Sequence, residues 1–149
     1  MAYRVFLDAD VLIAAFQGEQ PLRDCALAIL SEPLFEFIYN PLLKMEVMIQ
    51  PTYHRHNLEL AFYNEYFKNA TIFGDLDRMF EIGSREAMKH GIAVVDALHI
   101  ATAHLAKCSA LVTAEKDTKP MFRTKLVKVV TILGMSRPVH AVQKLLEAK

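Results

Sequence analysis

The sequence predicts a three-layer α/β/α fold, in which helices cover both faces of a parallel sheet. Short apolar segments rich in β-branched and aromatic residues alternate along the chain with segments of helical spacing, which indicates buried parallel strands. The chain has 149 residues, of which 53% are hydrophobic and 23% charged, so it is long and apolar enough to form a core. No repeat, low-complexity segment or linker interrupts it, and we expect one domain over residues 1–149.

Five segments have the composition of buried strands. The first is Tyr3–Leu7 (YRVFL), whose apolar run is followed at once by a carboxylate. The other predicted strands are Leu34–Tyr39, Thr71–Phe73, Ala110–Thr113 and Leu126–Leu133.

Seven segments have helical spacing. Pro21 and Pro41 each begin one of them, because proline is tolerated in the first turn of a helix, and Gly91 ends another. The predicted helices are Val11–Phe16, Pro21–Leu30, Pro41–Ile49, Asn57–Phe67, Leu76–Lys89, Asp96–Ala106 and Val139–Leu146.

Charge and cysteine content bound the location and the partners of the protein. The formal net charge is zero, with 17 basic and 17 acidic residues, so attraction to a nucleic acid would need a local basic patch. Cys25 and Cys108 have no metal-type spacing, which favours a reducing compartment. The N-terminus has no signal-peptide pattern, and no apolar run reaches the roughly 18 residues that cross a membrane. We therefore expect a soluble, cytoplasmic protein without a membrane partner.

Carboxylates follow several predicted strands at the same edge of the sheet. Asp8 follows the first strand, Glu46 lies in the helix after the second, and Asp96 begins the helix that leads to the fourth. Glu115 and Asp117 follow the fourth strand, and sites in open α/β sheets form beyond such strand ends. Carboxylates that meet there repel one another unless a cation lies between them, and oxygen ligands without thiolates favour Mg²⁺ or Mn²⁺. This placement predicts a metal site for phosphoryl or phosphodiester transfer.

Each of these acids also has a structural interpretation. Asp10 or Asp96 could cap the helix that follows it. Glu46 could be an exposed helix position, and Glu115 and Asp117 could be ordinary turn residues. Only the joint placement of the acids favours the metal site.

Four segments resemble the PIN domain family in order and spacing, over nearly the whole chain: VFLDADVLIAA, PLLKMEV, VVDALHIATA and ALVTAEKD. DALHIATA is the most specific of them. The resemblance implies a five-stranded parallel sheet of order 3-2-1-4-5 and a ribonuclease that uses Mg²⁺ or Mn²⁺ to cleave RNA. Many small bacterial members of that family are toxins, so the resemblance also implies an antitoxin partner.

The resemblance further implies a set of catalytic, metal-binding acids: Asp8, Glu46, Asp96 and an acid after Thr113. The family usually has aspartate two residues after that threonine, where this chain has Glu115. Either Glu115 substitutes, or Asp117 takes over, or the site is weakened.

Three other side chains are expected around these acids. Asp10 stands where the family often has asparagine and could orient Asp8 or a bound water. Thr113 could hydrogen-bond a ligand carboxylate or a phosphate. His99 lies on the same helix face as Asp96 and could be a ligand, a base or a packed histidine.

A basic run follows the fourth predicted strand. Its candidate RNA-binding residues are Lys116, Lys119, Arg123 and Lys125. Phe122 within this run could stack on a base, and an ordinary solvated surface is the alternative.

The segment Asn57–Phe67 predicts an interface between protein chains, most simply a homodimer. Its apolar residues form two stripes, Leu58, Phe62 and Tyr66, and Leu60, Tyr63 and Phe67, on either side of Glu59. Together they span about 200°, whereas one core contact needs about 100°. The alternative is that two neighbouring helices bury the whole arc.

Two other functions fit parts of the sequence. FLDADVL also matches the opening motif of haloacid-dehalogenase-type phosphatases, in which Asp8 would be the nucleophile and Asp10 the acid or base. The second alternative is a PIN-like module that binds RNA or protein with little or no turnover.

Overall fold

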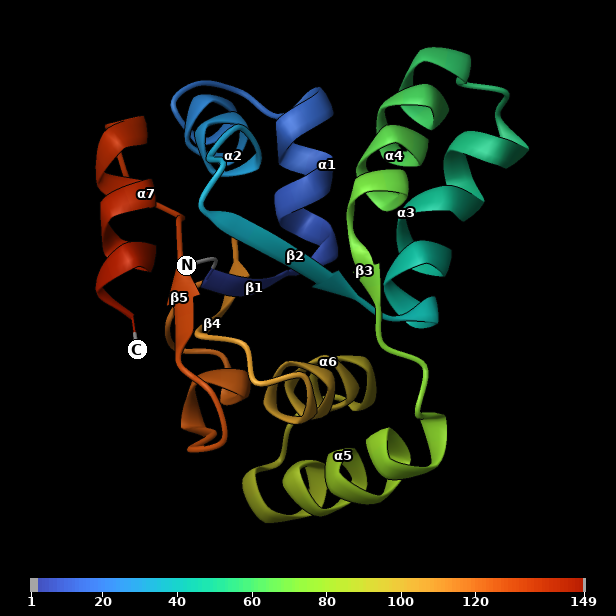
Figure 1. Cartoon of the computed structure of the whole chain (residues 1–149), viewed down its shortest axis with the longest axis vertical. Coiled ribbons are helices and arrows are strands. Elements are labelled where there is room, and N and C mark those ends of the chain that lie inside the picture. The colour runs from blue at the N-terminus through green and yellow to red at the C-terminus, as the bar shows by residue number, and fades with distance from the viewer. Residues whose placement is uncertain (1–2, 149) are drawn as a thin grey trace.

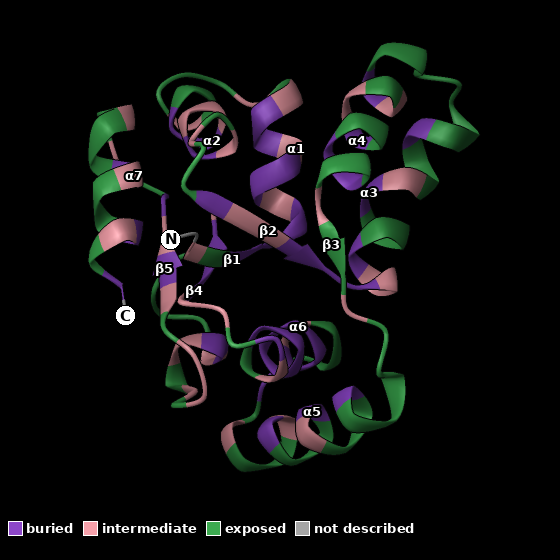
Figure 2. Ribbon diagram, in the orientation of Figure 1, coloured by how far each residue is buried: buried purple, intermediate pink, exposed green. Residues whose placement is uncertain are grey.

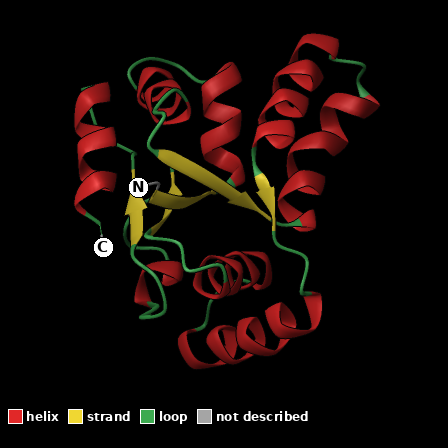
Figure 3. Cartoon of the chain, in the orientation of Figure 1, coloured by secondary structure: helices red, strands yellow, loops and turns green. Residues whose placement is uncertain are grey.

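The computed structural model describes residues 3–148. Its strands are β1 (Tyr3–Leu7), β2 (Phe35–Tyr39), β3 (Thr71–Ile72), β4 (Ala110–Thr113) and β5 (Val129–Thr131) (Figure 3). Its helices are α1 (Ala9–Gln17), α2 (Leu22–Leu30), α3 (Pro41–Tyr53), α4 (Asn57–Asn69), α5 (Leu76–His90), α6 (Val94–Leu105) and α7 (Pro138–Glu147), with a short 3₁₀ helix η1 (Pro120–Arg123).

The strands form one sheet of order β3-β2-β1-β4-β5, and every neighbouring pair is parallel. This confirms the predicted α/β class and the strand order. Figure 1 shows α1, α2 and α7 on one side of the sheet and α5 and α6 on the other, with α3 and α4 beside the β3 edge. Because β1 is central, the residue that follows it lies between neighbouring strands at the carboxyl edge.

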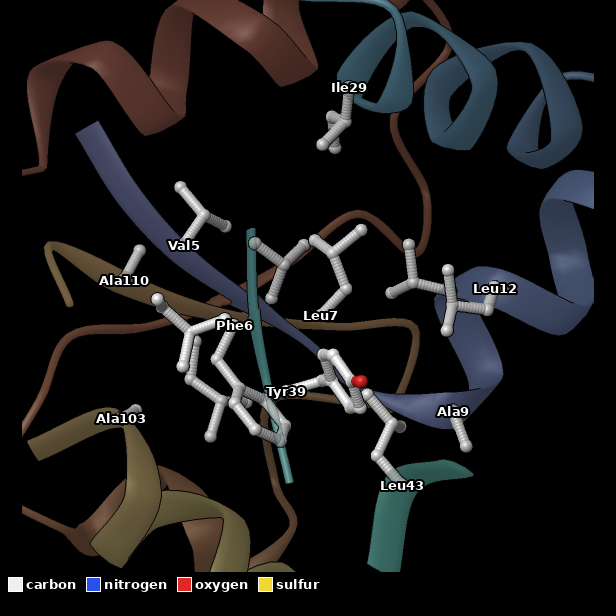
Figure 4. Close-up of a cluster of buried hydrophobic side chains, with 14 of the residues drawn as sticks. Val5, Phe6, Leu7, Ala9, Leu12, Ile29, Tyr39, Leu43, Ala103 and Ala110 are labelled. Atoms are coloured by element: carbon white, nitrogen blue, oxygen red, sulfur yellow. The ribbon is translucent and has the colours of Figure 1, made fainter. Parts of the chain in front are cut away.

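The core lies on both faces of β1. Val5, Phe6 and Leu7 are completely buried, as expected for a central parallel strand. Figure 4 shows Phe6 pointing toward Ala103 of α6, while Leu7 lies on the side of Ile29 of α2. Buried residues gather on the strands and on the helix faces that meet them, whereas much of α5 is exposed (Figure 2). Successive side chains of β1 point to opposite faces of the sheet, so this one strand packs against both helical layers.

The helix boundaries differ from the predictions by up to four residues, and three of the differences bear on the site or on a proline. α1 begins at Ala9, and Asp8, not Asp10, is its N-cap. α6 begins at Val94, so Asp96 lies inside the first turn and is not a cap. α3 continues past Pro51 to Tyr53, although proline leaves the carbonyl four residues earlier without its helical donor. Pro51 is buried, and packing of this kind offsets the cost of one lost hydrogen bond.

The apolar arc of α4 is largely covered by the rest of the chain. Tyr63, Tyr66 and Phe67 are buried, whereas Leu58 is 81% exposed. Glu59 is also buried, and the Tyr63 hydroxyl donates a hydrogen bond of 2.7 Å to its carboxylate. The expectation of an exposed patch is therefore wrong for most of this arc, because neighbouring elements cover it except at Leu58, where the first stripe begins. The homodimer itself stays a prediction.

Among the described residues, no helix combines the length and the apolar composition that a membrane crossing requires.

Candidate metal centre

Asp8 is held by three neighbouring elements at the carboxyl edge of the sheet. Its backbone N–H donates to the carbonyl of Val112 in β4 at 2.8 Å. Its Oδ1 accepts the N–H of Ala9 at 2.8 Å, which caps α1, and its Oδ2 accepts the Thr113 hydroxyl at 3.1 Å. The residue is only 7% exposed. These contacts fix the direction of the carboxylate before any ligand binds.

Asp10 links the first turn of α1 to the end of β4. Its Oδ1 accepts the N–H of Ala114 at 3.0 Å, and its Oδ2 lies 3.2 Å from the Thr113 hydroxyl oxygen, whose one hydrogen it shares with Asp8. Burial, reinforced by the nearby charge of Asp8, raises the pKa of Asp10 from 3.8 to about 7. Thr113 therefore contacts both Asp8 and Asp10 and links the two acids.

Glu46 and His99 complete a compact group with Asp8. One ligand atom from each of the three residues lies within 4.8 Å of the others. The His99 ring is buried, and its Nε2 lies 2.5 Å from Oε1 of Glu46. α3 and α6 therefore bring these two side chains together beside Asp8. Glu46 is exposed, so the group opens to solvent on the α3 side.

Asp96 and Glu115 lie outside that tight group but near enough to influence it. Burial raises the pKa of Asp96, and the charges of Asp8 and Glu115 raise it further. Glu115 is half-buried, and its Oε2 lies 3.8 Å from Nζ of Lys119. Asp117 is exposed on the turn that follows. Of the two acids considered for the fourth position, Glu115 is the one whose charge reaches the cluster.

The electrostatics of the cluster fit a hard divalent cation. Burial raises the pKa of Asp8, and the charge of Glu46 adds to the shift. Within residues 3–148, neither a lysine nor an arginine forms an ion pair with Asp8, Asp10 or Asp96. Carboxylates that are buried together without a cationic side chain are costly, and Mg²⁺ or Mn²⁺ would offset that cost with the oxygen ligands that these ions prefer. The donor set is thus suited to such an ion.

The sequence interpretation missed Asn40, at the end of β2. Asn40 is completely buried, and its Oδ1 accepts the N–H of Leu43 at 2.8 Å, which caps α3. Its Nδ2 lies 2.8 Å from the hydroxyl of Thr102 and 3.1 Å from Nδ1 of His99. The pair Asn-Pro before a helical segment was the available signal, because asparagine is a preferred N-cap and proline follows it well.

The candidate RNA-binding residues have different surroundings. All four are exposed, but Nη1 of Arg123 donates to the His90 carbonyl at 2.9 Å and thereby ties η1 to the end of α5. Phe122 is half-buried and packs against the core. Lys116 and Lys125 have no such structural tie among the contacts of the described residues.

Comparison with known proteins places this fold among characterised structures. The model of the PIN domain family matches residues 5–123. A chain of a toxin–antitoxin complex from Klebsiella pneumoniae superposes with a TM-score of 0.63 and 20% identity, covering 83% of this chain and 94% of that one. A chain of VapBC2 from Rickettsia felis, bound to a promoter DNA fragment, superposes with a TM-score of 0.64 and 11% identity, covering 86% and 98%. No curated protein is significantly similar in sequence.

Proposed function

Because the chain belongs to the PIN domain family, whose members are generally nucleases, we propose that it is a metal-dependent endoribonuclease. Its substrate is single-stranded or structured RNA, and its metal is Mg²⁺ or Mn²⁺. The observation that carries the proposal is the convergence of Asp8, Glu46 and Asp96 at one strand edge, where no lysine or arginine of residues 3–148 forms an ion pair with them. The phosphatase alternative is set aside for two reasons. The family match covers most of the chain, and the Asp10 carboxylate, which would be the acid or base of a phosphatase, is engaged in hydrogen bonds with Ala114 and Thr113.

The carboxylates of Asp8, Glu46, Asp96 and Glu115 would hold the metal. A divalent ion at such a site supplies an activated water and stabilises the leaving oxygen of a phosphodiester. The protein holds the ligands in place: Thr113 and the start of α1 fix Asp8, and the rigid α6 carries Asp96. Little reorganisation is then needed when the metal and the RNA bind.

A cleavage assay tests the proposal directly. The protein is incubated with single-stranded RNA and Mn²⁺, with EDTA in a parallel sample. Cleavage that requires Mn²⁺ and stops with EDTA is the expected result. RNA binding without cleavage would instead favour the non-catalytic module, for which the glutamate at position 115 is the specific observation.

Substitution of the two candidate fourth acids separates their roles. Glu115→Gln is expected to lower Mn²⁺ affinity and RNA cleavage by about tenfold or more, because a ligand of the cluster loses its charge. Asp117→Asn serves as the matched control and should leave both quantities unchanged, because Asp117 is exposed and turned to solvent. Calorimetric titration with Mn²⁺ measures the affinity. The reverse ranking of the two variants would assign the fourth position to Asp117.

RNA binding is expected to depend on the lysines near the site. Lys116→Glu combined with Lys125→Glu should weaken binding and flatten its dependence on salt, by about 0.7 in the logarithmic slope for each lost contact with a single strand. Lys144→Glu is the control, because Lys144 is an exposed residue of α7, which packs on α2. Fluorescence anisotropy over a salt series measures the slope. An unchanged slope would remove both lysines from the interface.

A protein partner is the second part of the proposal. Both similar solved chains come from toxin–antitoxin assemblies, which supports a toxin role for this chain and an antitoxin as its partner. The structure also offers an apolar groove of about 640 Å³ along α3 and β3. Met45, Ile49, Tyr53 and Ile72, which line it, are each more than half exposed. Exposed apolar surfaces of this kind usually mark protein interfaces.

The same groove supports the predicted homodimer. Ile49→Asp combined with Tyr53→Asp is expected to convert a dimer into a folded monomer, because two charges would enter an apolar contact. Met88→Asp on α5, at a residue that is 79% exposed, is the control. Sedimentation equilibrium gives the mass. A wild-type protein that is monomeric at high micromolar concentration would contradict the dimer and leave the groove to the antitoxin.

A further inference from the structure

We propose that Asn40 and His99 position the carboxylate of Glu46, and that His99 is a hydrogen-bond donor to this acid and not a metal ligand. The proposal rests on the proposed function in one respect, that Glu46 binds the metal. The other part of the proposal is that Nε2 of His99, and not Nδ1, carries the proton. This part does not depend on whether the protein binds a metal or cleaves RNA.

The orientation of the Asn40 amide is fixed by its neighbours. The N–H of Leu43 can only donate, so the atom of Asn40 that faces it must be the oxygen. The amide nitrogen then faces Thr102 and His99. The Thr102 hydroxyl gives its own hydrogen to the carbonyl of Leu98 at 2.9 Å and is therefore free to accept. The opposite amide orientation would place an NH₂ group against the N–H of Leu43.

This amide orientation decides the tautomer of His99. Nδ1 faces an N–H of Asn40 and must accept it, so Nδ1 carries no proton. The proton of the neutral ring is then on Nε2, which lies 2.5 Å from Oε1 of Glu46 and donates to it. The ring plane is held as well, because the rings of Phe6 and His99 lie 4.9 Å apart between their centroids.

Metal binding by His99 would break this network. A metal takes a bare ring nitrogen, and Nε2 is the one that faces Glu46 and Asp8. Freeing Nε2 would move the proton to Nδ1, where it would meet the N–H of Asn40. The proximity of His99 to the two acids therefore indicates support for a ligand. Support of this kind is typical of metal sites.

Asn40 controls Glu46 from two directions. Its oxygen caps α3, the helix that carries Glu46, and its nitrogen fixes the ring that bonds the carboxylate of the same residue. The position of the backbone and the direction of the side chain are thus set by one buried amide.

The tautomer can be measured on the wild-type protein without metal. Nitrogen-15 NMR of the imidazole is expected to show a bare Nδ1 and a protonated Nε2 for His99. A protonated Nδ1 would overturn the proposal, whatever the protein does to RNA. This measurement needs no substitution, so a variant that fails to fold does not weaken it.

The effect on the metal is tested with two variants of His99. The amide nitrogen of glutamine reaches the place of Nε2, whereas that of asparagine reaches only the place of Nδ1. His99→Asn is therefore expected to lower Mn²⁺ affinity by about 10–100-fold, and His99→Gln to restore most of it. His104→Gln, at an exposed position of α6, is the matched control and should bind Mn²⁺ like the wild type. Thermal unfolding of each variant separates loss of metal from loss of fold.

Asn40→Ser separates the two tasks of the amide. Serine caps a helix about as well as asparagine but is too short to reach His99. We expect α3 to remain helical by circular dichroism while Nδ1 loses its donor and Mn²⁺ affinity falls. Equal Mn²⁺ affinity for wild type, His99→Asn and Asn40→Ser would overturn the inference. A wild-type protein that binds no Mn²⁺ would instead refute the proposed function, and only the tautomer measurement would then bear on His99.

Discussion

Replacing Asp8 with asparagine is expected to abolish RNA cleavage while leaving the protein folded. Asp8 is the most constrained acid of the cluster, so its loss should cost more than the roughly 100-fold that removal of a supporting residue can cost. Asparagine keeps an oxygen that can accept the N–H of Ala9, so the cap of α1 survives. Removing one of several like charges should also stabilise the metal-free protein, by on the order of 1 kcal/mol.

The two halves of this prediction are measured separately. Cleavage of single-stranded RNA with Mn²⁺ gives the activity, and calorimetry with EDTA should show a melting temperature higher by about 2–4 °C. Asp24→Asn, at an exposed position of α2, is the control for loss of a carboxylate elsewhere. Full activity of Asp8→Asn would remove the strand-edge acids from the mechanism. A large loss of stability would show instead that the contacts of the Asp8 carboxylate with Ala9 and Thr113 outweigh the relief of charge repulsion.

The second large effect is on stability: the metal-free protein is expected to become less stable as the pH rises toward neutrality. The pKa of Asp10 is about 7 in the folded protein, against an ordinary value of 3.8, and burial also raises the pKa of Asp8 and Asp96. Between these values the folded chain holds protons that the unfolded chain has released, so stability falls with rising pH. Above about pH 7 the cost of the Asp10 charge is complete, on the order of 4 kcal/mol, which lowers the melting temperature by roughly 8–16 °C.

Mn²⁺ should remove this dependence, because a bound cation favours the ionised carboxylates. At a concentration of about 100 times its Kd, the ion adds about 2.7 kcal/mol to the stability. Differential scanning calorimetry between about pH 5.5 and pH 8, with EDTA or with Mn²⁺, measures both effects. Asp10→Asn is expected to flatten the slope of the metal-free protein. A melting temperature that rises with pH in EDTA would contradict this prediction, because it would show that ionisation of these acids does not destabilise the metal-free protein.

The predictable parts of the molecule are those in which local pattern and burial agree. The run YRVFL became the central strand because it is apolar on both faces, and Gly91 ends α5 at a φ of +68°, a conformation that glycine adopts without strain. The proximity of Asp8 and Glu46 was also predictable, since a parallel sheet brings its carboxyl strand ends together.

What the sequence concealed depends on contacts between distant segments. Asn40 reads as an ordinary cap, and its second role appears only when α6 is packed beside α3. Glu59 and Tyr63 seemed part of an exposed arc, because helical spacing alone does not indicate which other elements pack on the helix. Arg123 is exposed, as a residue that binds RNA would be, but one nitrogen of its guanidinium also holds the end of α5. In each case tertiary packing, which spacing alone does not encode, decided the environment.

The shortness of the two edge strands also limits how the chain can aggregate. β1 and β2 have five residues each, whereas the edge strands β3 and β5 have two and three. An edge strand recruits another chain by offering a row of free amide and carbonyl groups, and edges this short offer very few. A second molecule can hardly extend the sheet by strand addition, so self-association must use side-chain surfaces on the helices. The short edge strands therefore also protect the protein, whose central strands are strongly apolar, from growth into fibrils.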